Sequence, residues 1–155
     1  MNQFYTPEMY IPRKTSFDIN KFNETMQLFV GSHNFNAFAG QINQSNKKNV
    51  KRFEISGYNG EYEKINTIRT IYNVTVLVVP ASEDFMAVTI RIHLSGALYK
   101  MIRNIVGTAI DVVVGKLTEF DVLRLLEDGC SREDNKSKPV DGKGLRLIEV
   151  LYSGF

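Results

Sequence analysis

The sequence feature that most restricts the fold is an abrupt change of hydrophobic period at Ser95 and Gly96. Just before this point, large apolar residues occupy every second position of residues 86–94, the pattern of a strand with one buried face. Just after it, apolar residues recur at helical spacing: Leu98, Met101, Ile102, Ile105, Val106, Ala109, Ile110 and Val113. A strand followed directly by an amphipathic helix predicts that the helix packs on one face of a sheet.

Two further segments have the pattern of strands. Alternating, valine-rich residues 72–79 end at Pro80, and we expect them to pair with residues 86–94 as an antiparallel hairpin. A last strand is predicted at residues 145–152, after a polar loop at residues 130–143.

Two further helices are predicted from their boundary residues. Asp18 is a suitable N-cap for a helix through Val30, which Gly31 ends. Thr118 and Asp121 resemble a capping box that opens another helix, predicted to reach residue 128.

The order helix, hairpin, two helices and strand predicts an α+β fold. It has a mainly antiparallel sheet, helices packed on one face and the other face free. Residues 1–16 contain two prolines and no sustained period, so we expect an arm or the remnant of a linker there. Residues 17–155 form the domain, in which residues 40–66 are a polar insertion with one weak strand around Phe53 and Ile55.

Composition restricts the setting of the chain. The apolar share of 43% and the charged share of 23% are ordinary for a globular protein. No run approaches the ~18 apolar residues of a membrane span, and the N-terminus lacks the features of a signal peptide. The single cysteine, Cys130, cannot form an internal disulfide. We expect an intracellular protein without a membrane partner, in either cytoplasm or nucleus.

Motifs for metal or cofactor chemistry are missing from the sequence. His33 and His93 have no acidic or cysteine residue at ligand spacing, so we predict no metal site. The chain has no glycine-rich phosphate loop and no nucleophile elbow. We predict no cofactor, and the chain alone does not have the pattern of a complete enzyme.

Arg103 is the most informative charged residue, because it lies at the border of the apolar stripe of its helix. Gly107, one turn later, leaves room for another backbone or a phosphate to approach the guanidinium. Arginine is well suited to a bidentate grip on a carboxylate or phosphate. The alternative, weighed equally, is an arginine that extends from the helix edge into solvent.

The sheet face opposite the helices is the second candidate site. Phe85, Thr89, Arg91 and His93 are predicted to point there, and a mixture of aromatic and basic groups is typical of platforms for single-stranded RNA. An ordinary solvated or dimer-covered face is the favoured alternative. The net charge of +2 gives no general signal for a polyanion partner.

Four further motifs form an ordered set. They are Leu-Phe-Val-Gly-Ser-His-Asn-Phe-Asn-Ala-Phe at residues 28–38, Arg-Thr-Ile at 69–71, Gly-Ala-Leu-Tyr-Lys-Met-Ile-Arg-Asn-Ile-Val-Gly at 96–107 and Gly-Leu-Arg-Leu-Ile-Glu-Val-Leu-Tyr at 144–152. In order and rough spacing, this set resembles the C-terminal half of the TruA-type tRNA pseudouridine synthases. Within it, the Met-Ile-Arg-Asn-Ile-Val-Gly block is specific, and the other segments are informative as a set.

The resemblance implies a half-module whose sheet continues into a related N-terminal half, with a basic cleft for tRNA between the halves. Family members isomerise uridine to pseudouridine, starting from an aspartate and without a metal or organic cofactor. Arg103 is implied as the ion-pair partner of that aspartate, because an aspartate beside an arginine stays ionised and oriented. The RNA contacts that we expect in the cleft are His33, Arg69, Arg91, His93, Lys100 and Lys143.

The sequence departs from the family pattern in two important ways. The segment that bears the aspartate, Arg-Thr-Asp-x-Gly-Val-His, is absent from all 155 residues, as is the tyrosine that accompanies it. We therefore expect a fragment, an isolated domain or a degenerate relative, inactive by itself. Ala97 stands where the family has phenylalanine, which affects pocket shape and substrate choice, and Asn34 replaces an aspartate.

The partners implied by the resemblance are tRNA, the missing N-terminal catalytic half and a second copy of the chain in a homodimer. Two other classes of function stay open. One is a non-catalytic RNA-binding module of RRM-like layout that uses the face from Phe85 to His93, and the other is a structural or dimerising domain.

Overall fold

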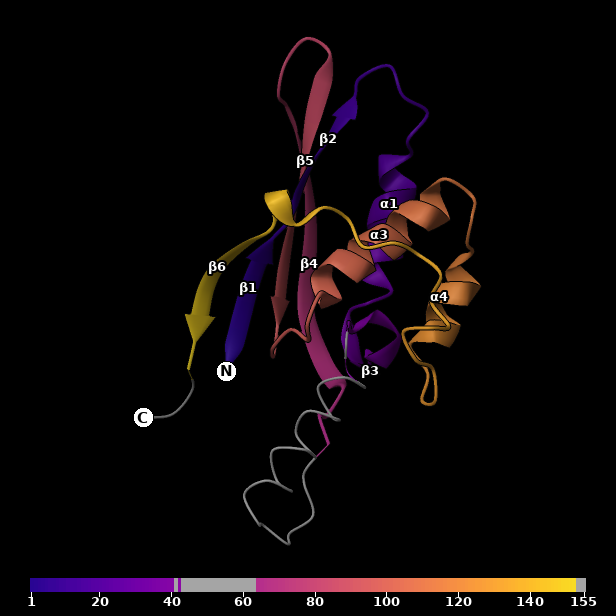
Figure 1. The fold of residues 1–155 in the computed structure, drawn as a ribbon. Helices are drawn as coiled ribbons and strands as arrows, with labels where there is room; N and C mark the ends of the chain where they lie inside the picture. Colours follow the sequence, from indigo (N-terminus) through magenta and orange to yellow (C-terminus); the bar gives the residue numbers. More distant parts are fainter. Residues whose placement is uncertain (41, 43–63, 153–155) are drawn as a thin grey trace, which may run out of the picture.

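An antiparallel sheet is the frame of the computed structural model, which describes residues 1–40, 42 and 64–152 (Figure 1). Its strands within these residues are β1 (Asn2–Thr6), β2 (Glu8–Pro12), β3 (Gly31–Asn34), β4 (Ile68–Pro80), β5 (Phe85–Leu94) and β6 (Arg146–Leu151). Their order is β3-β4-β5-β1-β6, and β2 also pairs with β5. Helices α1 (Ile19–Gln27), α3 (Met101–Val113) and α4 (Glu119–Leu125) lie on the same side of the sheet (Figure 1). The predicted α+β fold is confirmed.

Residues 1–16 are not the predicted arm or linker remnant, because most of them form β1 and β2. β1 pairs with β5 and β6, and β2 continues along the same side of β5. Pro7, which has no N–H to donate, separates the two strands, and its carbonyl accepts a hydrogen bond from the Ile90 amide at 2.9 Å. Two five-residue strands are too short for a recognisable period, so their partner β5 decides their structure.

The predicted hairpin is formed by β4 and β5, with an irregularity at its base. Along most of their length the two strands pair in one antiparallel register, but the register shifts between Ile71 and Asn73. A bulge of this kind inserts one unpaired residue, here Tyr72, and reverses the side on which the next residues lie. Simple alternation would place Tyr72 and Val74 on the same face of the sheet. Because of the bulge, Tyr72 is 50% exposed whereas Val74 is 3% exposed. A period-two pattern alone could not reveal this shift.

The helices begin much as their caps predict. Asp18 accepts a hydrogen bond from the Lys21 amide at 3.0 Å, and Thr118 and Asp121 form both bonds of a capping box. α3 begins later than its apolar period suggests, because Lys100 adopts a left-handed backbone conformation with φ of 57°. α4 is also shorter than predicted and ends at residue 125. Among the described residues, no helix has the length and apolar character needed to cross a bilayer.

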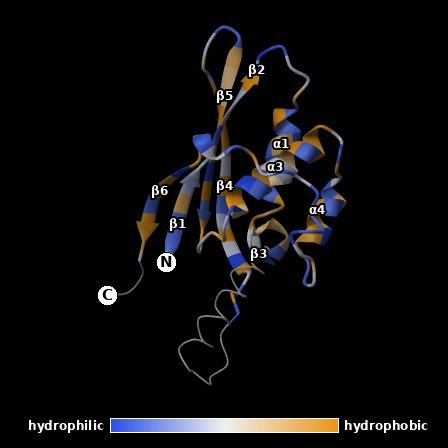
Figure 2. Ribbon diagram, viewed as in Figure 1, coloured by the Kyte–Doolittle hydropathy of each residue, from blue (hydrophilic) through white to orange (hydrophobic). Residues whose placement is uncertain are grey.

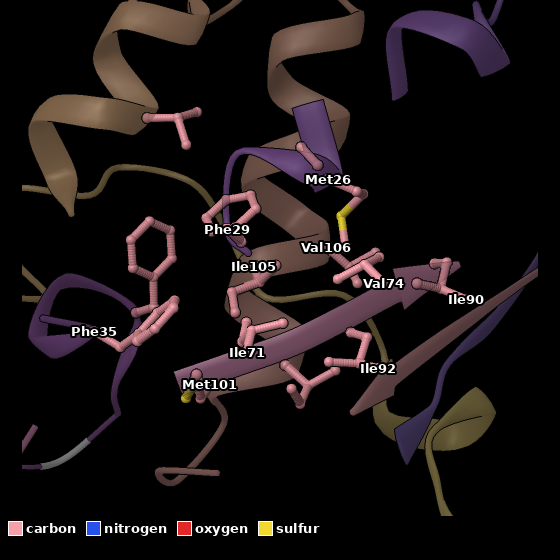
Figure 3. Close-up of a cluster of buried hydrophobic side chains, with 14 of the residues drawn as sticks. Met26, Phe29, Phe35, Ile71, Val74, Ile90, Ile92, Met101, Ile105 and Val106 are labelled. Carbon is pink, nitrogen blue, oxygen red and sulfur yellow. The ribbon is translucent and has the colours of Figure 1, made fainter. Parts of the chain in front are cut away.

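The core lies between the sheet and the helix layer, as Figure 3 shows for a central part of it. Hydrophobic and hydrophilic residues alternate on the elements around it (Figure 2), as expected where each has one buried side. Its central members are buried side chains from α1, β4, β5 and α3: Phe22, Met26, Ile71, Val74, Ile90, Ile92, Met101 and Ile105. Most of the insertion predicted at residues 40–66, with its strand around Phe53 and Ile55, lies outside the described residues.

Candidate functional site

Arg103 is the third residue of α3 and is fixed to the chain by backbone groups. Its Nε donates a hydrogen bond to the Val140 carbonyl oxygen at 2.7 Å, and the Val140 amide donates to the Arg103 carbonyl oxygen at 3.1 Å. Gly142 also approaches the guanidinium, since a Cβ at this position would lie 3.5 Å from the Arg103 Cζ. The side chain is therefore anchored at Nε and does not extend freely into solvent.

The guanidinium borders a cavity of ≈ 440 Å³, which we call the Arg103 groove. It lies between α3, β2 and the segment that leads into β6, and its polar residues are Glu8, Tyr10, Arg103, Asp141, Lys143 and Arg146. The short 3-10 helix η2 (Gly142–Gly144) meets β2 so closely that a Cβ at Gly144 would overlap the Glu8 carbonyl oxygen. The volume lies within the range of small-ligand sites, and the rest of the lining is apolar.

Arg103 has no carboxylate partner in the described part of the chain. The ion pair found there within 4.0 Å joins Lys116 to Asp111, neither of which lines the Arg103 groove. The Arg103 hydrogen bonds recorded among the same residues use Nε and the main chain. As far as the described residues go, both terminal Nη groups are therefore available for a bidentate bond to a carboxylate or phosphate.

Each of the two carboxylates of the Arg103 groove accepts a hydrogen bond from a group other than Arg103. Glu8 Oε1 accepts a hydrogen bond from the Tyr10 hydroxyl at 2.7 Å, and this bond to Glu8 raises the pKa of Tyr10. Asp141 Oδ1 accepts from the Lys143 amide at 3.0 Å and so caps η2. Among the described residues neither acid side chain forms an ion pair with Arg103 within 4.0 Å.

The sheet face opposite the helices holds a second cavity, of ≈ 530 Å³, which we call the open-face groove. Three of the four residues predicted on this face, Thr89, Arg91 and His93, line it, whereas Phe85 does not. The His93 ring stacks on the Phe4 ring, with ring centroids 4.2 Å apart. It also lies against the Tyr72 ring, with ring centroids 4.8 Å apart. Among the described residues the buried His93 Nε2 has no hydrogen-bond partner.

His33 and Arg69 face each other across β3 and β4 and line neither groove. Arg69 Nη1 donates to the carbonyl oxygens of Asn66 at 2.6 Å and Ile68 at 2.8 Å, and burial lowers the pKa of Arg69. His33 Nε2 lies 3.0 Å from the Val30 carbonyl oxygen. These polar atoms are bonded to the chain itself, so the pair contributes few free groups to a site.

Lys100 lies beside the Arg103 groove without lining it. Its Nζ is 5.4 Å from the centre of the Tyr99 ring. Together with Ala97 it lines a smaller hollow of ≈ 270 Å³. Tyr5 and Leu145 also line this hollow, and Leu145 borders the Arg103 groove as well. The alanine that departs from the family pattern therefore lies next to the candidate site.

The hydrogen bonds of Asn34 explain why this position holds asparagine and not the aspartate of the family pattern. Its amide nitrogen donates to the Asp128 carboxylate at 3.1 Å, and its amide oxygen accepts from the Thr67 hydroxyl at 2.7 Å. An aspartate at this position would face a second carboxylate, and like charges so close are unfavourable. Asn34 is therefore paired with Asp128 of this chain.

Sequence reasoning missed the residues that hold Arg103. Val140 and Gly142, which contact Arg103, belong to a segment predicted only as polar loop, and Glu8, which lines the groove, belongs to the supposed arm. The available signal was Gly107, which indicated a close approach by another backbone. A Cβ at Gly107 would overlap the Lys138 carbonyl oxygen, so it is this loop that approaches the helix.

Comparison with known proteins gives a consistent result. The family model described as tRNA pseudouridine synthase matches residues 25–153. A tRNA pseudouridine synthase A from Clostridium kluyveri is 32% identical over 144 residues, which cover 92% of this chain and 47% of the relative. The protein of the same name from Chlamydia trachomatis serovar A is 33% identical over 135 residues, covering 87% of this chain and 41% of the relative.

A third relative matches a similar share of this chain. The tRNA pseudouridine synthase A of Thermoanaerobacter sp. (strain X514) is 30% identical over 135 residues, 87% of this chain and 45% of that protein. The chain therefore spans about half the length of the curated relatives it matches.

Proposed function

The chain belongs to the tRNA pseudouridine synthase family, and from this premise we propose that it forms the arginine-bearing side of an active site that converts uridine to pseudouridine in tRNA. The observation that carries the proposal is the state of Arg103. Its guanidinium is fixed at Nε by Val140, and its Nη groups are free in the described residues. A fixed fork with free donors is suited to hold a carboxylate in its ionised form.

In this proposal the carboxylate belongs to an aspartate on another segment of the enzyme, because the Arg-Thr-Asp-x-Gly motif does not occur in these 155 residues. The matched relatives are about twice as long as the matched region, which leaves room for such a segment. The aspartate and the target uridine meet Arg103 in the Arg103 groove. The apolar part of its lining reduces contact with water and so strengthens the ion pair.

The proposed reaction is an isomerisation, so its atoms balance without a co-reactant. The bond between N1 and C1′ of uridine breaks, the uracil turns, and a bond between C5 and C1′ forms. The hydrogen on C5 leaves as a proton, and N1 gains a proton. Arg103 keeps the aspartate charged, as either a nucleophile or a base must be. The proposal includes no metal or organic cofactor.

We further propose that tRNA contacts both grooves. Lys143 supplies a cation beside Arg103, and Arg91 is exposed on the open face. His93 lines the open-face groove, and Lys100 lies beside the Arg103 groove. His33 and Arg69 are the weaker candidates, because their polar atoms already bond the chain. Phosphate contacts of this kind give binding that weakens with salt.

The test uses a chimera in which this chain replaces the matching residues of the Clostridium kluyveri relative. We expect the chimera to release tritium from C5-labelled uridine in tRNA and the chain alone to release none. Arg103→Ala in the chimera should abolish release, whereas Lys116→Ala, which removes an exposed side chain outside the groove, should not. A folded chimera that binds tRNA but releases no tritium contradicts the proposal, as does turnover by the chain alone.

A non-catalytic RNA-binding module is the second candidate, favoured by one observation. Phe4, His93 and Tyr72 place three rings side by side on the open face, near Arg91. Aromatic rings beside a cation can bind single-stranded bases. A tight, sequence-selective complex of the chain alone with RNA, insensitive to salt, would favour this candidate, whereas weak and steeply salt-dependent binding favours the synthase.

A further inference from the structure

We propose that Asn135 and Thr108 are positioning residues for Arg103, which they orient through the segment of residues 137–140. An effect of these residues on the reaction rests on the proposed function, but their effect on the orientation of Arg103 does not. Neither residue touches the guanidinium. They act by fixing the backbone carbonyl to which Arg103 Nε donates.

The first anchor of this segment is at Arg103 itself. Val140 makes two reciprocal hydrogen bonds with it, one from the Val140 amide at 3.1 Å and one to the Val140 carbonyl at 2.7 Å. One turn later in α3, the Lys138 carbonyl lies so close to Gly107 that any Cβ there would overlap it. Because the obstacle is backbone, it could not be relieved by a side-chain rotation. The segment therefore lies directly on the helix surface at two successive turns.

The second anchor is a buried polar contact between Asn135 and Thr108. The Asn135 Nδ2 donates to the Thr108 hydroxyl at 3.1 Å, and that hydroxyl donates to the Asn104 carbonyl oxygen at 2.8 Å. Asn135 is 3% exposed and Thr108 is 0% exposed. A buried amide that lost this partner would be left unsatisfied, so the contact strongly selects one position of the segment.

The segment is also braced by Arg132 and Asn135, which precede it in the chain. Arg132 donates from its two Nη groups to the carbonyl oxygens of Asn135 and Ser137. The Asn135 Oδ1 accepts a hydrogen bond from the Ser137 amide at 3.1 Å. These bonds leave little freedom between the Thr108 anchor and the carbonyl at Val140.

Three contacts, at Arg103, Gly107 and Thr108, thus attach one braced segment to one helix. The Val140 carbonyl is held in place by this segment and does not move with the Arg103 side chain. The side chain therefore adopts the orientation that its hydrogen bond to this carbonyl requires. Preorganisation of this kind places a charged group before its partner arrives. A loop that served only to cover the helix would not need its carbonyl directed at an arginine.

The experiment measures the Arg103 Nε–H signal by nitrogen-15 NMR in the chain alone, with Arg103→Lys identifying the signal. Thr108→Val keeps the shape of the side chain but removes the hydroxyl, and Thr108→Ser restores it. We expect hydrogen exchange at Arg103 Nε to accelerate about tenfold in Thr108→Val, the factor that corresponds to one ordinary hydrogen bond. Asn135→Ala should do the same, whereas Thr108→Ser and the exposed loop control Glu133→Ala should not.

The proposal is overturned if the Nε–H exchange is unchanged in Thr108→Val while the amide spectrum shows a folded protein. It is also overturned if Arg103 Nε in the unmodified chain exchanges as fast as in free arginine, a measurement that does not depend on any variant folding. In the chimera described above, Thr108→Val should lower kcat with KM unchanged. An inactive chimera would contradict the proposed function and leave the NMR result to decide the positioning role.

Discussion

The Arg103 groove and the open-face groove are both bordered by β5 and β6, but they hold their basic groups in different ways. In the first, Arg103 is fixed by a backbone carbonyl, and its Nη donors have no hydrogen-bond partner within the described ranges. In the second, His93 is held by ring contacts with Phe4 and Tyr72, and its Nε2 is buried without a partner in the described residues. The first arrangement holds a positive charge at a defined point. The second presents aromatic rings, whose stacking contacts with a ligand are less directional than hydrogen bonds.

The difference is informative about the roles that each groove can perform. A reaction requires a charge at a defined place, and hydrogen bonds to backbone provide such a place because they are directional. RNA binding tolerates looser contacts, because stacking and phosphate attraction depend weakly on direction. On this comparison, substitutions in the Arg103 groove should change the rate of reaction, and substitutions on the open face should change affinity.

The largest expected effect is that of Arg103→Lys in an active assembly such as the chimera. Lysine keeps the charge but loses the planar fork and the Nε donor that Val140 accepts, so we expect turnover to fall about 100-fold or more. Affinity for tRNA should change little, because the charge remains. Single-turnover rates and filter binding measure the two quantities. Unchanged turnover would remove the distinction between the grooves.

The next effect concerns β6, the strand that borders both grooves. Within the described residues it pairs only with β1, and its Leu147 and Ile148 are 50% and 61% exposed. Free apolar edges favour pairing with another chain, so we expect the isolated chain to self-associate at micromolar concentration. Ile148→Lys should weaken this association about tenfold or more, whereas Val114→Lys, at the end of α3, should not.

Light scattering measures the self-association of the chain through its molar mass in solution. A clean monomer of 17.7 kDa in the unsubstituted chain would show that the β6 edge does not pair. Association that survives Ile148→Lys would instead point to another surface, such as the hairpin of β4 and β5.

A smaller effect is expected for Arg91→Ala on the open face. Loss of one phosphate contact should weaken tRNA binding uniformly across sequences and reduce the slope of log affinity against log salt by about 1. Arg124→Ala, an exposed arginine on the helix side, is the matched control. An unchanged slope for Arg91→Ala would assign the open face to another role and leave the Arg103 groove as the RNA contact.

The smallest effect is expected for Ala97→Phe, which restores the ring of the family pattern. The ring should fill the hollow beside Tyr5 and Leu145 and raise the free energy of unfolding by about 0.5–1 kcal/mol. Urea denaturation measures this change. A loss of stability would indicate that the hollow closes around alanine, since overpacking is destabilising.

The sequence by itself determined the elements whose signals are local. The hairpin of β4 and β5, the caps at Asp18 and Thr118 and the apolar stripe of α3 follow from periodicity and from side chains that bond their own backbone. The Met-Ile-Arg-Asn-Ile-Val-Gly block also identified the family and singled out Arg103. These features depend on neighbours within a few residues, so they can be read before the chain folds.

The tertiary structure alone decided which distant groups meet. β1 and β2 exist because β5 offers them a free side, and the bulge at Tyr72 gives Tyr72 and Val74 different exposure although they alternate in the sequence pattern. Val140 reaches Arg103 across 37 residues of sequence. No local pattern encodes such contacts, because their energy comes from hydrogen bonds and burial that form only when the segments have packed together.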